Sequence, residues 1–245
     1  MHDERQVIRV GGADARDFLQ GLISNDVNKL AEGLVYTAML TPQGKLIADF
    51  FLVPSGENIL IDVHADLAAG LLQRLTMYKL RSAVDLEMTD RQVTRGLGEP
   101  PSGAFEDPRH PSLGWRGYDD QPGQDVDWDA IRVAACVPQS GIELGPDTFI
   151  LEAGFERLNG VDFRKGCYVG QEVTARMKHK TELRKGLATV TVDGSADVGT
   201  EITANDKAVG TLYTQSGGQG IAYLRFDRAQ SEMMADGALL RLNNT

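Results

Sequence analysis

The sequence predicts an α+β fold: a body of mixed and antiparallel sheets with helices, followed by a small C-terminal β-barrel. Residues 34–40 and 45–53 are strand-like runs on either side of a Thr-Pro-Gln-Gly turn, which is typical of an antiparallel hairpin. Apolar residues recur at helical spacing between Leu67 and Tyr78. After residue 185 the chain becomes a series of short strand-like segments separated by turns, which is typical of a small barrel.

The first part of the chain, which we bound at residues 1–100, alternates predicted strands with predicted helices. Amphipathic helices are expected at residues 15–23 and 67–78. Strands are expected at residues 6–10, 34–40, 45–53, 58–63 and 80–86. Because a hairpin occurs among these elements, the pattern favours an α+β arrangement over a doubly wound parallel sheet.

The second part, residues 101–181, follows a stretch of Pro, Gly, Asp and Ser at residues 99–124 that predicts a long loop. Asp127 is expected to cap a helix that ends before Pro138. A further helix is predicted at residues 169–178.

The third part, residues 182–245, carries the predicted barrel. Its strands are expected at residues 186–192, 201–204, 208–215, 220–225 and 238–242. Asp-Gly, Asn-Asp and Gly-Gly pairs lie between several of these segments and supply turn chemistry. We place the boundary before the barrel near Thr181.

The charge and hydropathy of the chain exclude some classes of partner. The net charge is −10 and the isoelectric point is near 4.9. Nucleic-acid binding proteins need a basic face, so we expect no direct nucleic-acid partner. No apolar run has the length of a membrane span, and the first residues hold no apolar signal core. We therefore expect a cytoplasmic protein without a membrane partner.

Basic residues gather in one stretch of this acidic chain. A local basic patch is suited to a small anionic ligand, although an exposed, solvated helix face explains the same residues equally well. The stretch contains Arg164, Lys165, Arg176, Lys178, Lys180, Arg184 and Lys185.

The two cysteines, Cys136 and Cys167, are far apart in sequence and form no CxxC pair. In a cytosolic protein two separate thiols are expected rather than a disulfide, although the sequence leaves both open. Two cysteines and four scattered histidines form a poor ligand set, so we expect no metal site.

The stretch from Lys165 to Glu172 concentrates reactive side chains around Cys167. Gly166 and Gly170 flank the thiol and suggest a shaped turn. Cationic neighbours, including Lys165, and the start of a following helix favour the thiolate form. The alternative is that Cys167 is a small buried hydrophobe, as many cysteines are.

These residues carry a family resemblance. Lys165-Gly166-Cys167-Tyr168-x-Gly170-Gln171-Glu172, followed by Ala175-Arg176, resembles the signature of the YgfZ family of folate-binding proteins. That family is linked to iron–sulfur cluster assembly and repair and is related to the T-protein, the aminomethyltransferase of the glycine cleavage system. The resemblance implies a T-protein-like body, tetrahydrofolate or a derivative as cofactor, and iron–sulfur proteins or assembly factors as partners. A link to tRNA modification would be indirect.

The resemblance also implies folate-binding residues. Asn25, Asp26 and Asp49 lie in segments that resemble the family and would border the folate cavity. Glu152 lies in a Leu-Glu-Ala-Gly segment like that of T-proteins, where its carboxylate would accept two N–H bonds from the pterin. Arg176 of the signature is assigned to the same ligand. Structural readings remain open: a turn for Asn25 and Asp26, an outward-facing strand position for Asp49, and a helix N-terminal acid for Glu152.

Three functions follow from these residues. The first is a tetrahydrofolate-binding accessory factor in iron–sulfur cluster assembly or repair, with Cys167 as its functional thiol and no classical enzymatic activity. The second is a folate-dependent aminomethyltransferase of the T-protein type. In T-proteins the catalytic aspartate follows a similar strand end by several residues; in the corresponding residues 63–71 Asp66 is too close, and the cysteine signature is foreign to T-proteins. The third is a folate-binding module that tolerates loss of the thiol.

Overall fold

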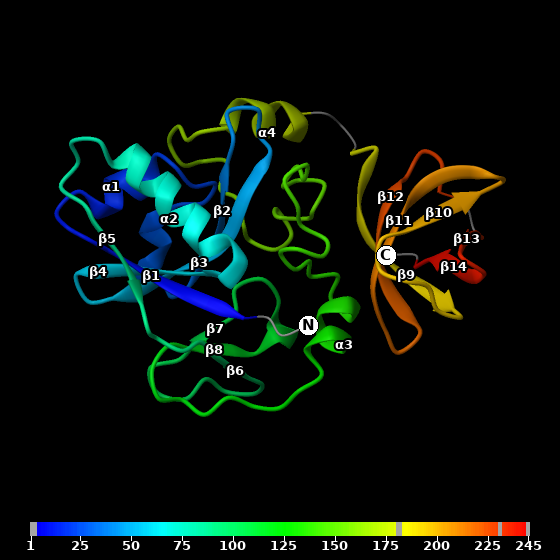
Figure 1. Ribbon diagram of the computed structural model, residues 1–245, viewed down its shortest axis with the longest axis horizontal. Helices are drawn as coiled ribbons and strands as arrows, with labels where there is room; N and C mark the ends of the chain where they lie inside the picture. The colour runs from blue at the N-terminus through cyan, green and yellow to red at the C-terminus, as the bar shows by residue number, and fades with distance from the viewer. Residues whose placement is uncertain (1–3, 180–182, 230–231, 244–245) are drawn as a thin grey trace. The chain divides into compact units, whose positions relative to one another are not determined.

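The computed structural model describes residues 4–179, 183–229 and 232–243. Its contacts group into two compact units, one of residues 1–126 with 155–175 and one of residues 127–154 with 176–245. Antiparallel sheets with helices in the first unit and a closed barrel in the second confirm the predicted fold class (Figure 1). The predicted boundary near Thr181, and Lys180 of the basic stretch, lie outside the described residues. The boundary after residue 100 stays a prediction.

A five-stranded antiparallel sheet forms the centre of the first unit, with strand order β2-β3-β4-β1-β5. The predicted hairpin is confirmed, since β2 pairs with β3 around the turn at residues 41–45. The strands are β1 (Arg5–Gly11), β2 (Val35–Leu40), β3 (Leu46–Ser55), β4 (Asn58–His64) and β5 (Asp85–Thr89).

Two helices, α1 (Ala15–Gln20) and α2 (Ala65–Lys79), pack on this sheet (Figure 1). Their apolar residues, among them Leu19 and Leu71, join strand residues such as Ile8 in one core. The first helix is shorter than the predicted 15–23, because the chain turns at Gly21 to bring Ser24 against β2. Ser24 N donates to Ala38 O at 2.9 Å, and Ser24 Oγ donates to the Gly160 carbonyl at 2.7 Å.

A second, three-stranded sheet has the order β6-β8-β7. Its strands are β6 (Thr94–Gly96), β7 (Phe105–Glu106) and β8 (Trp115–Gly117), with the short 3₁₀ helix η2 (Pro111–Leu113) before β8. The prediction of a long loop over residues 99–124 was therefore wrong in part. Very short strands do not show the alternation that identifies longer ones, and Pro and Gly between them dominate the local signal.

Buried ion pairs link the two sheets of the first unit. Asp62 of β4 is fully buried and accepts from Arg5 Nε at 2.6 Å and from Arg116 Nη1 at 2.9 Å. Arg116 Nε also donates to Asp107 Oδ2 at 3.1 Å. Arg109 donates to both oxygens of Asp107, from Nε to Oδ1 at 3.0 Å and from Nη2 to Oδ2 at 2.8 Å. Opposite charges with several hydrogen bonds each compensate one another's desolvation.

The remaining segments of the first unit lead to the thiol loop. The 3₁₀ helix η1 (Val27–Ala31) follows the turn at Asn25, and α4 (Gln171–Lys178) begins at Gln171 of the signature and continues into the second unit. The last helix begins two residues later than predicted, because Gly170 has a φ of +85° that ordinary helical residues do not adopt.

The second unit contains a closed six-stranded barrel of order β10-β11-β12-β9-β14-β13, as predicted except for one strand. The sequence analysis did not predict β13, because a strand of three residues is too short to show an alternating pattern. The strands are β9 (Lys185–Asp193), β10 (Thr200–Ala204), β11 (Lys207–Ser216), β12 (Gln219–Arg225), β13 (Met233–Ala235) and β14 (Ala238–Leu242).

The predicted helix before the barrel is α3 (Trp128–Ala134) in the second unit, and Asp127 caps it by accepting from Ala130 N at 3.0 Å. Thr189 of β9 donates to the Val133 carbonyl at 3.2 Å, so helix and barrel are in direct contact.

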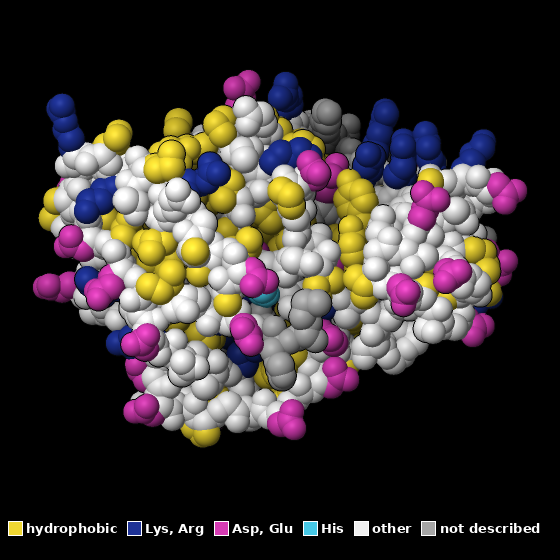
Figure 2. Space-filling view, viewed as in Figure 1, with side chains coloured by type: hydrophobic (Ala, Val, Ile, Leu, Met, Phe, Trp, Pro, Cys, Tyr) yellow, Lys and Arg dark blue, Asp and Glu magenta, His cyan; other side chains and the backbone are white. Residues whose placement is uncertain are grey.

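None of the helices within residues 4–179, 183–229 and 232–243 is long and apolar enough to cross a membrane. In the view of Figure 2, Asp and Glu side chains lie on the surface of both units, in keeping with the net charge of −10.

Candidate functional site

Cys167 is exposed on a loop of the first unit whose flanking residues are fixed. Lys165 before it and Tyr168 after it are both only 8% exposed, whereas Gly166 and Cys167 face solvent. The alternative of a buried structural cysteine is therefore wrong. Cys136 is half-buried, and the two residues are thiols rather than a disulfide.

The glycines beside the thiol differ in what they do. Gly170 needs its positive φ, and a Cβ there would lie 2.6 Å from Thr41 O and 2.9 Å from Leu40 Cβ. Gly166 has open space around its Cα and no positive φ, so its backbone does not require glycine. Only the second glycine therefore supports the predicted shaped turn, by allowing the chain to approach the β2–β3 hairpin.

Lys165 is placed differently from what we expected. Its Nζ donates to the carbonyls of Gln20, Ile23 and Asn25 at 2.7, 2.6 and 2.9 Å. An ammonium group has three N–H donors, so all are used by the backbone. Lys165 therefore donates no hydrogen bond to Cys167, and the expectation that nearby cations favour the thiolate stays a prediction. Arg164 is the exposed cation beside the loop.

Asn25 and Asp26 both hold the turn after α1. Asn25 is 2% exposed, and its Nδ2 donates to the Tyr36 and Asn159 carbonyls, both at 2.7 Å. Asp26 caps η1 by accepting from Asn28 N at 2.9 Å. These bonds agree with the turn reading; contact with folate stays a prediction for both residues.

Asp49 is 3% exposed, which rules out the outward-facing strand position. It accepts from the Tyr36 hydroxyl at 3.0 Å. Burial and the carboxylate raise the pKa of Tyr36 well above its usual range, so the phenol remains a donor. A role for Asp49 in folate binding stays a prediction.

The signature residues after the loop are mostly exposed. Gln171 Nε2 reaches the Gly166 carbonyl at 3.5 Å, a weak bond across the loop. Glu172 and Arg176 are exposed on α4. The division between the two units falls within α4, so Arg176 belongs to the second unit and Cys167 to the first.

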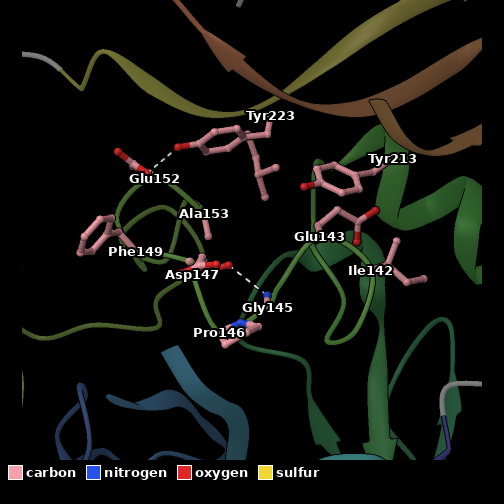
Figure 3. A pocket seen from close by; sticks show the side chains of 12 residues that line it. Ile142, Glu143, Gly145, Pro146, Asp147, Phe149, Glu152, Ala153, Tyr213 and Tyr223 are labelled. Atoms are coloured by element: carbon pink, nitrogen blue, oxygen red, sulfur yellow. Dashed lines mark hydrogen bonds between the residues drawn. The ribbon is translucent and has the colours of Figure 1, made fainter. Parts of the chain in front are cut away.

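Glu152 lies in the second unit and lines a cavity of about 340 Å³ (Figure 3). Its Oε2 accepts from the Tyr223 hydroxyl of β12 at 2.7 Å, and its backbone carbonyl accepts from Leu187 N at 2.8 Å. Glu152 lies within a series of turns and no helix begins there, so the reading as a helix N-terminal acid is wrong. The cavity lies between these turns and barrel strands; its walls include Glu143, Asp147, Phe149, Leu187, Tyr213 and Tyr223.

The acids of this cavity have different surroundings. Glu143 is buried and accepts from Arg132 Nη1 at 2.9 Å and from Thr214 Oγ1 at 2.7 Å, so its charge is compensated. Burial and Glu152 raise the pKa of Tyr223, and burial and Glu143 raise that of Tyr213. The cavity therefore offers the Glu152 carboxylate as an acceptor beside the Tyr223 phenol, and both tyrosine phenols of its wall stay protonated.

Sequence reasoning did not find Tyr213, Tyr223, Glu143 or Arg132. The two tyrosines lie within predicted strands, where an aromatic residue has an ordinary packing role. Arg132 and Glu143 are eleven residues apart with a turn between them, and no motif marks such a pair. Only the closure of the barrel onto the preceding turns brings these four residues to one place.

The fold of the chain matches that of a solved structure. The chain is similar to the crystal structure of glycine cleavage system aminomethyltransferase T from Bartonella henselae, with a TM-score of 0.78 over 99% of this chain and 83% of that one. At 14% identity this likeness shows the fold alone. Residues 184–244 match the family described as the CAF17 C-terminal β-barrel domain.

Two proteins with similar sequences add to the likeness in fold. An uncharacterized protein of Haemophilus influenzae is 30% identical over 241 residues, covering 90% of this chain and 85% of that protein. The mitochondrial iron–sulfur cluster assembly factor IBA57 homolog of Neurospora crassa is 34% identical over 222 residues, covering 74% of this chain. That alignment covers 50% of the fungal protein, so the chain spans about half its length. The chain is therefore similar to the Haemophilus influenzae protein over most of both lengths and to IBA57 proteins over part of theirs, and its barrel matches the CAF17 C-terminal domain.

The relatives correct one prediction. The Neurospora crassa protein, and the mouse and human factors of the same name, are mitochondrial. The expected cytoplasmic location is therefore wrong. Bulk composition could not have revealed this, because ordinary hydrophobic and charged fractions do not distinguish one aqueous compartment from another.

Proposed function

We propose that this protein is a tetrahydrofolate-binding accessory factor in iron–sulfur cluster assembly or repair, and that Cys167 is its functional thiol. The observation that carries the proposal is the exposure of Cys167 between two buried signature residues. The IBA57 relatives are named as iron–sulfur cluster assembly factors, which supports the same process for this chain.

A thiol in such a position suits contact with a partner. An exposed thiolate can bind iron or attack a sulfur species, whereas a buried one cannot reach either. The cluster would be cargo or substrate, and the partners would be iron–sulfur proteins or the factors that assemble them. The signature residues Lys165, Gly170 and Tyr168 hold the loop, and Gln171 and Glu172 follow it on α4.

The chemistry of the Glu152 cavity supports a pterin ligand. An aminopyrimidinone ring presents parallel N–H donors, and a carboxylate accepts two such bonds. Phe149, Tyr213 and Tyr223 add aromatic surface to the same cavity. Bound tetrahydrofolate would supply one-carbon or redox chemistry, and Glu152 would hold and orient its ring.

The proposal is tested by titrating the purified protein with tetrahydrofolate and following bound ligand by calorimetry. We expect Glu152→Gln to bind more weakly by about tenfold or more, because it loses a charge-assisted bond. Cys167→Ala should bind like the wild type, since the thiol is not among the residues that line the Glu152 cavity. Glu201→Gln, which removes an exposed carboxylate from β10, is the matched control.

Two results would contradict the proposal. No saturable tetrahydrofolate binding by the wild type would remove the folate part. Equal affinity of the wild type and Glu152→Gln would remove Glu152 as the anchor of the pterin.

A further inference from the structure

In the loop that carries Cys167, a buried residue lies on either side of two exposed ones. The proposed thiol chemistry does not by itself require this arrangement. Lys165 and Tyr168 are each 8% exposed, and the two residues between them are exposed. Val169 packs against the core of the first unit. The thiol therefore lies at the tip of a short segment that is fixed at both ends.

The fixed point before the thiol is a buried cation. The Lys165 ammonium donates to Gln20 O, Ile23 O and Asn25 O, at distances between 2.6 and 2.9 Å. These carbonyls belong to the end of α1 and the turn after it, where the helix leaves acceptors without partners. Leaving buried carbonyls without donors is costly, so the lysine and the turn depend on each other.

Further bonds attach the same segment to the same turn. Asp162 N donates to Ser24 O at 3.0 Å, and Asp162 Oδ2 pairs with Lys29 Nζ at 2.7 Å. Asp162 Oδ1 accepts from the backbone N–H groups of Arg164 and Lys165 at 2.7 and 3.2 Å. The thiol segment thus leaves the turn at a defined point and in a defined direction.

We propose that Lys165 is a positioning residue for Cys167. Lys165 attaches the thiol loop to three carbonyls at the end of α1 and in the turn after it, and does not act by stabilising the thiolate through its charge. This inference rests on the proposed function for the meaning of the thiol, but the attachment itself does not. Its three donors are all directed at the backbone, so none is available to the sulfur. Burial lowers the pKa of Lys165 to about 8, while Asp26 and Asp162 act in the opposite direction.

The inference distinguishes lysine from arginine at this position. Three acceptors around one nitrogen suit the compact ammonium group, whereas a guanidinium is a planar fork that spreads its donors. Lys165→Arg therefore keeps the charge and loses the attachment. Arg164→Met is the matched control, because it removes a neighbouring cation that is exposed and makes none of the three carbonyl contacts.

The test uses the full chain with Cys136→Ser, so that Cys167 is the one remaining thiol of the two in the sequence. Lys165→Met, Lys165→Arg and Arg164→Met are compared by the pH profile of Cys167 alkylation with iodoacetamide. Amide hydrogen exchange of residues 163–169 is measured on the same proteins. We expect exchange in the loop to rise on the order of tenfold in both Lys165 variants and to stay unchanged in Arg164→Met. The midpoint of the alkylation profile should be the same in Lys165→Met and Arg164→Met.

Two outcomes overturn the inference. If the alkylation midpoint rises by about one pH unit in Lys165→Met relative to Arg164→Met, the lysine acts through its charge. If the loop of Lys165→Arg remains as protected as that of the wild type, a cation of either kind is sufficient. The second outcome is decisive even if Lys165→Met does not fold.

A separate measurement keeps this inference distinct from the proposed function. Lys165→Met should restore iron–sulfur enzyme activity in a strain lacking its own family member no better than Cys167→Ser does. Full activity of Cys167→Ser would remove the proposed role of the thiol, and the exchange data would still decide whether Lys165 fastens the loop. Full activity of Lys165→Met beside an inactive Cys167→Ser would remove Lys165 as a positioning residue while leaving the thiol role intact.

Discussion

The buried ion pairs of the first unit give the sharpest prediction about its stability. Asp107 is 5% exposed and is held by Arg109 and Arg116. Burial alone would raise its pKa, but the two guanidinium groups prevail and lower it from 3.8 to about 2. At about 1.4 kcal/mol for each pH unit, the ionised carboxylate contributes about 2 kcal/mol to the free energy of unfolding at neutral pH.

Asp107→Asn should lose more than this amount at pH 7. The variant leaves the buried Arg109 guanidinium without the carboxylate it pairs with, while Arg116 keeps Asp62, and breaking such a buried pair typically costs about 3–5 kcal/mol. The sign of the pH dependence follows from the lowered pKa. The contribution of Asp107 is complete above pH 4 and is lost as the pH falls towards 2, so wild type and variant should converge there.

Urea unfolding followed by tryptophan fluorescence measures this effect. Trp115 is buried in the small sheet beside Asp107, and Trp128→Phe removes the other tryptophan, which belongs to the second unit. Asp119→Asn is the matched control, because Asp119 also pairs with an arginine but is exposed, and such pairs contribute about 0–1 kcal/mol. If Asp107→Asn is no less stable than Asp119→Asn, or if its deficit persists unchanged to pH 2, the reasoning is refuted.

Three further predictions concern other buried groups. Glu143→Gln removes the buried carboxylate that pairs with Arg132 Nη1 and leaves that guanidinium with the exposed Asp129 as its partner, so thermal melts should show a loss of about 1.5–3 kcal/mol; a loss below about 1 kcal/mol contradicts this. Gly160→Ala places a Cβ about 2.6 Å from the Phe155 ring and should destabilise the first unit by about 1–3 kcal/mol in urea, while an unchanged midpoint would show that the ring yields freely. The pKa of Lys165 is lowered from 10.5 to about 8, so the unfolded chain binds more protons between these values; stability should rise with pH in that window for wild type but not for Lys165→Met.

The sequence predicted the helices and strands that are long enough to show several repeats of their period. The β2–β3 hairpin, α2 and five of the six barrel strands were identified because each runs long enough for alternation or helical spacing to show. The strands of the small sheet and β13 are two or three residues long, and no periodicity exists at that length. Their positions depend on pairing with distant strands.

The candidate site divides in the same way. The signature identified Cys167, whose exposure the structure shows. The role of Lys165 could not be read from its neighbours, since its three acceptors lie about 140 residues away in the sequence. Tyr223 donates to Glu152 only because the barrel closes, and the sequence around either residue does not indicate that the two are in contact. The reactive residue could therefore be identified from its neighbours in the sequence, whereas the distant residues that hydrogen-bond to the site residues could not.

The central claim is tested most directly by complementation in a strain that lacks its own member of the family. Iron–sulfur enzyme activity is measured after expression of the wild type, Cys167→Ser and Cys136→Ser at matched protein levels. We expect wild type and Cys136→Ser to restore the activity and Cys167→Ser to leave it at the level of the empty vector. Full restoration by Cys167→Ser would contradict the account, because the exposed sulfur would then have no part in the process.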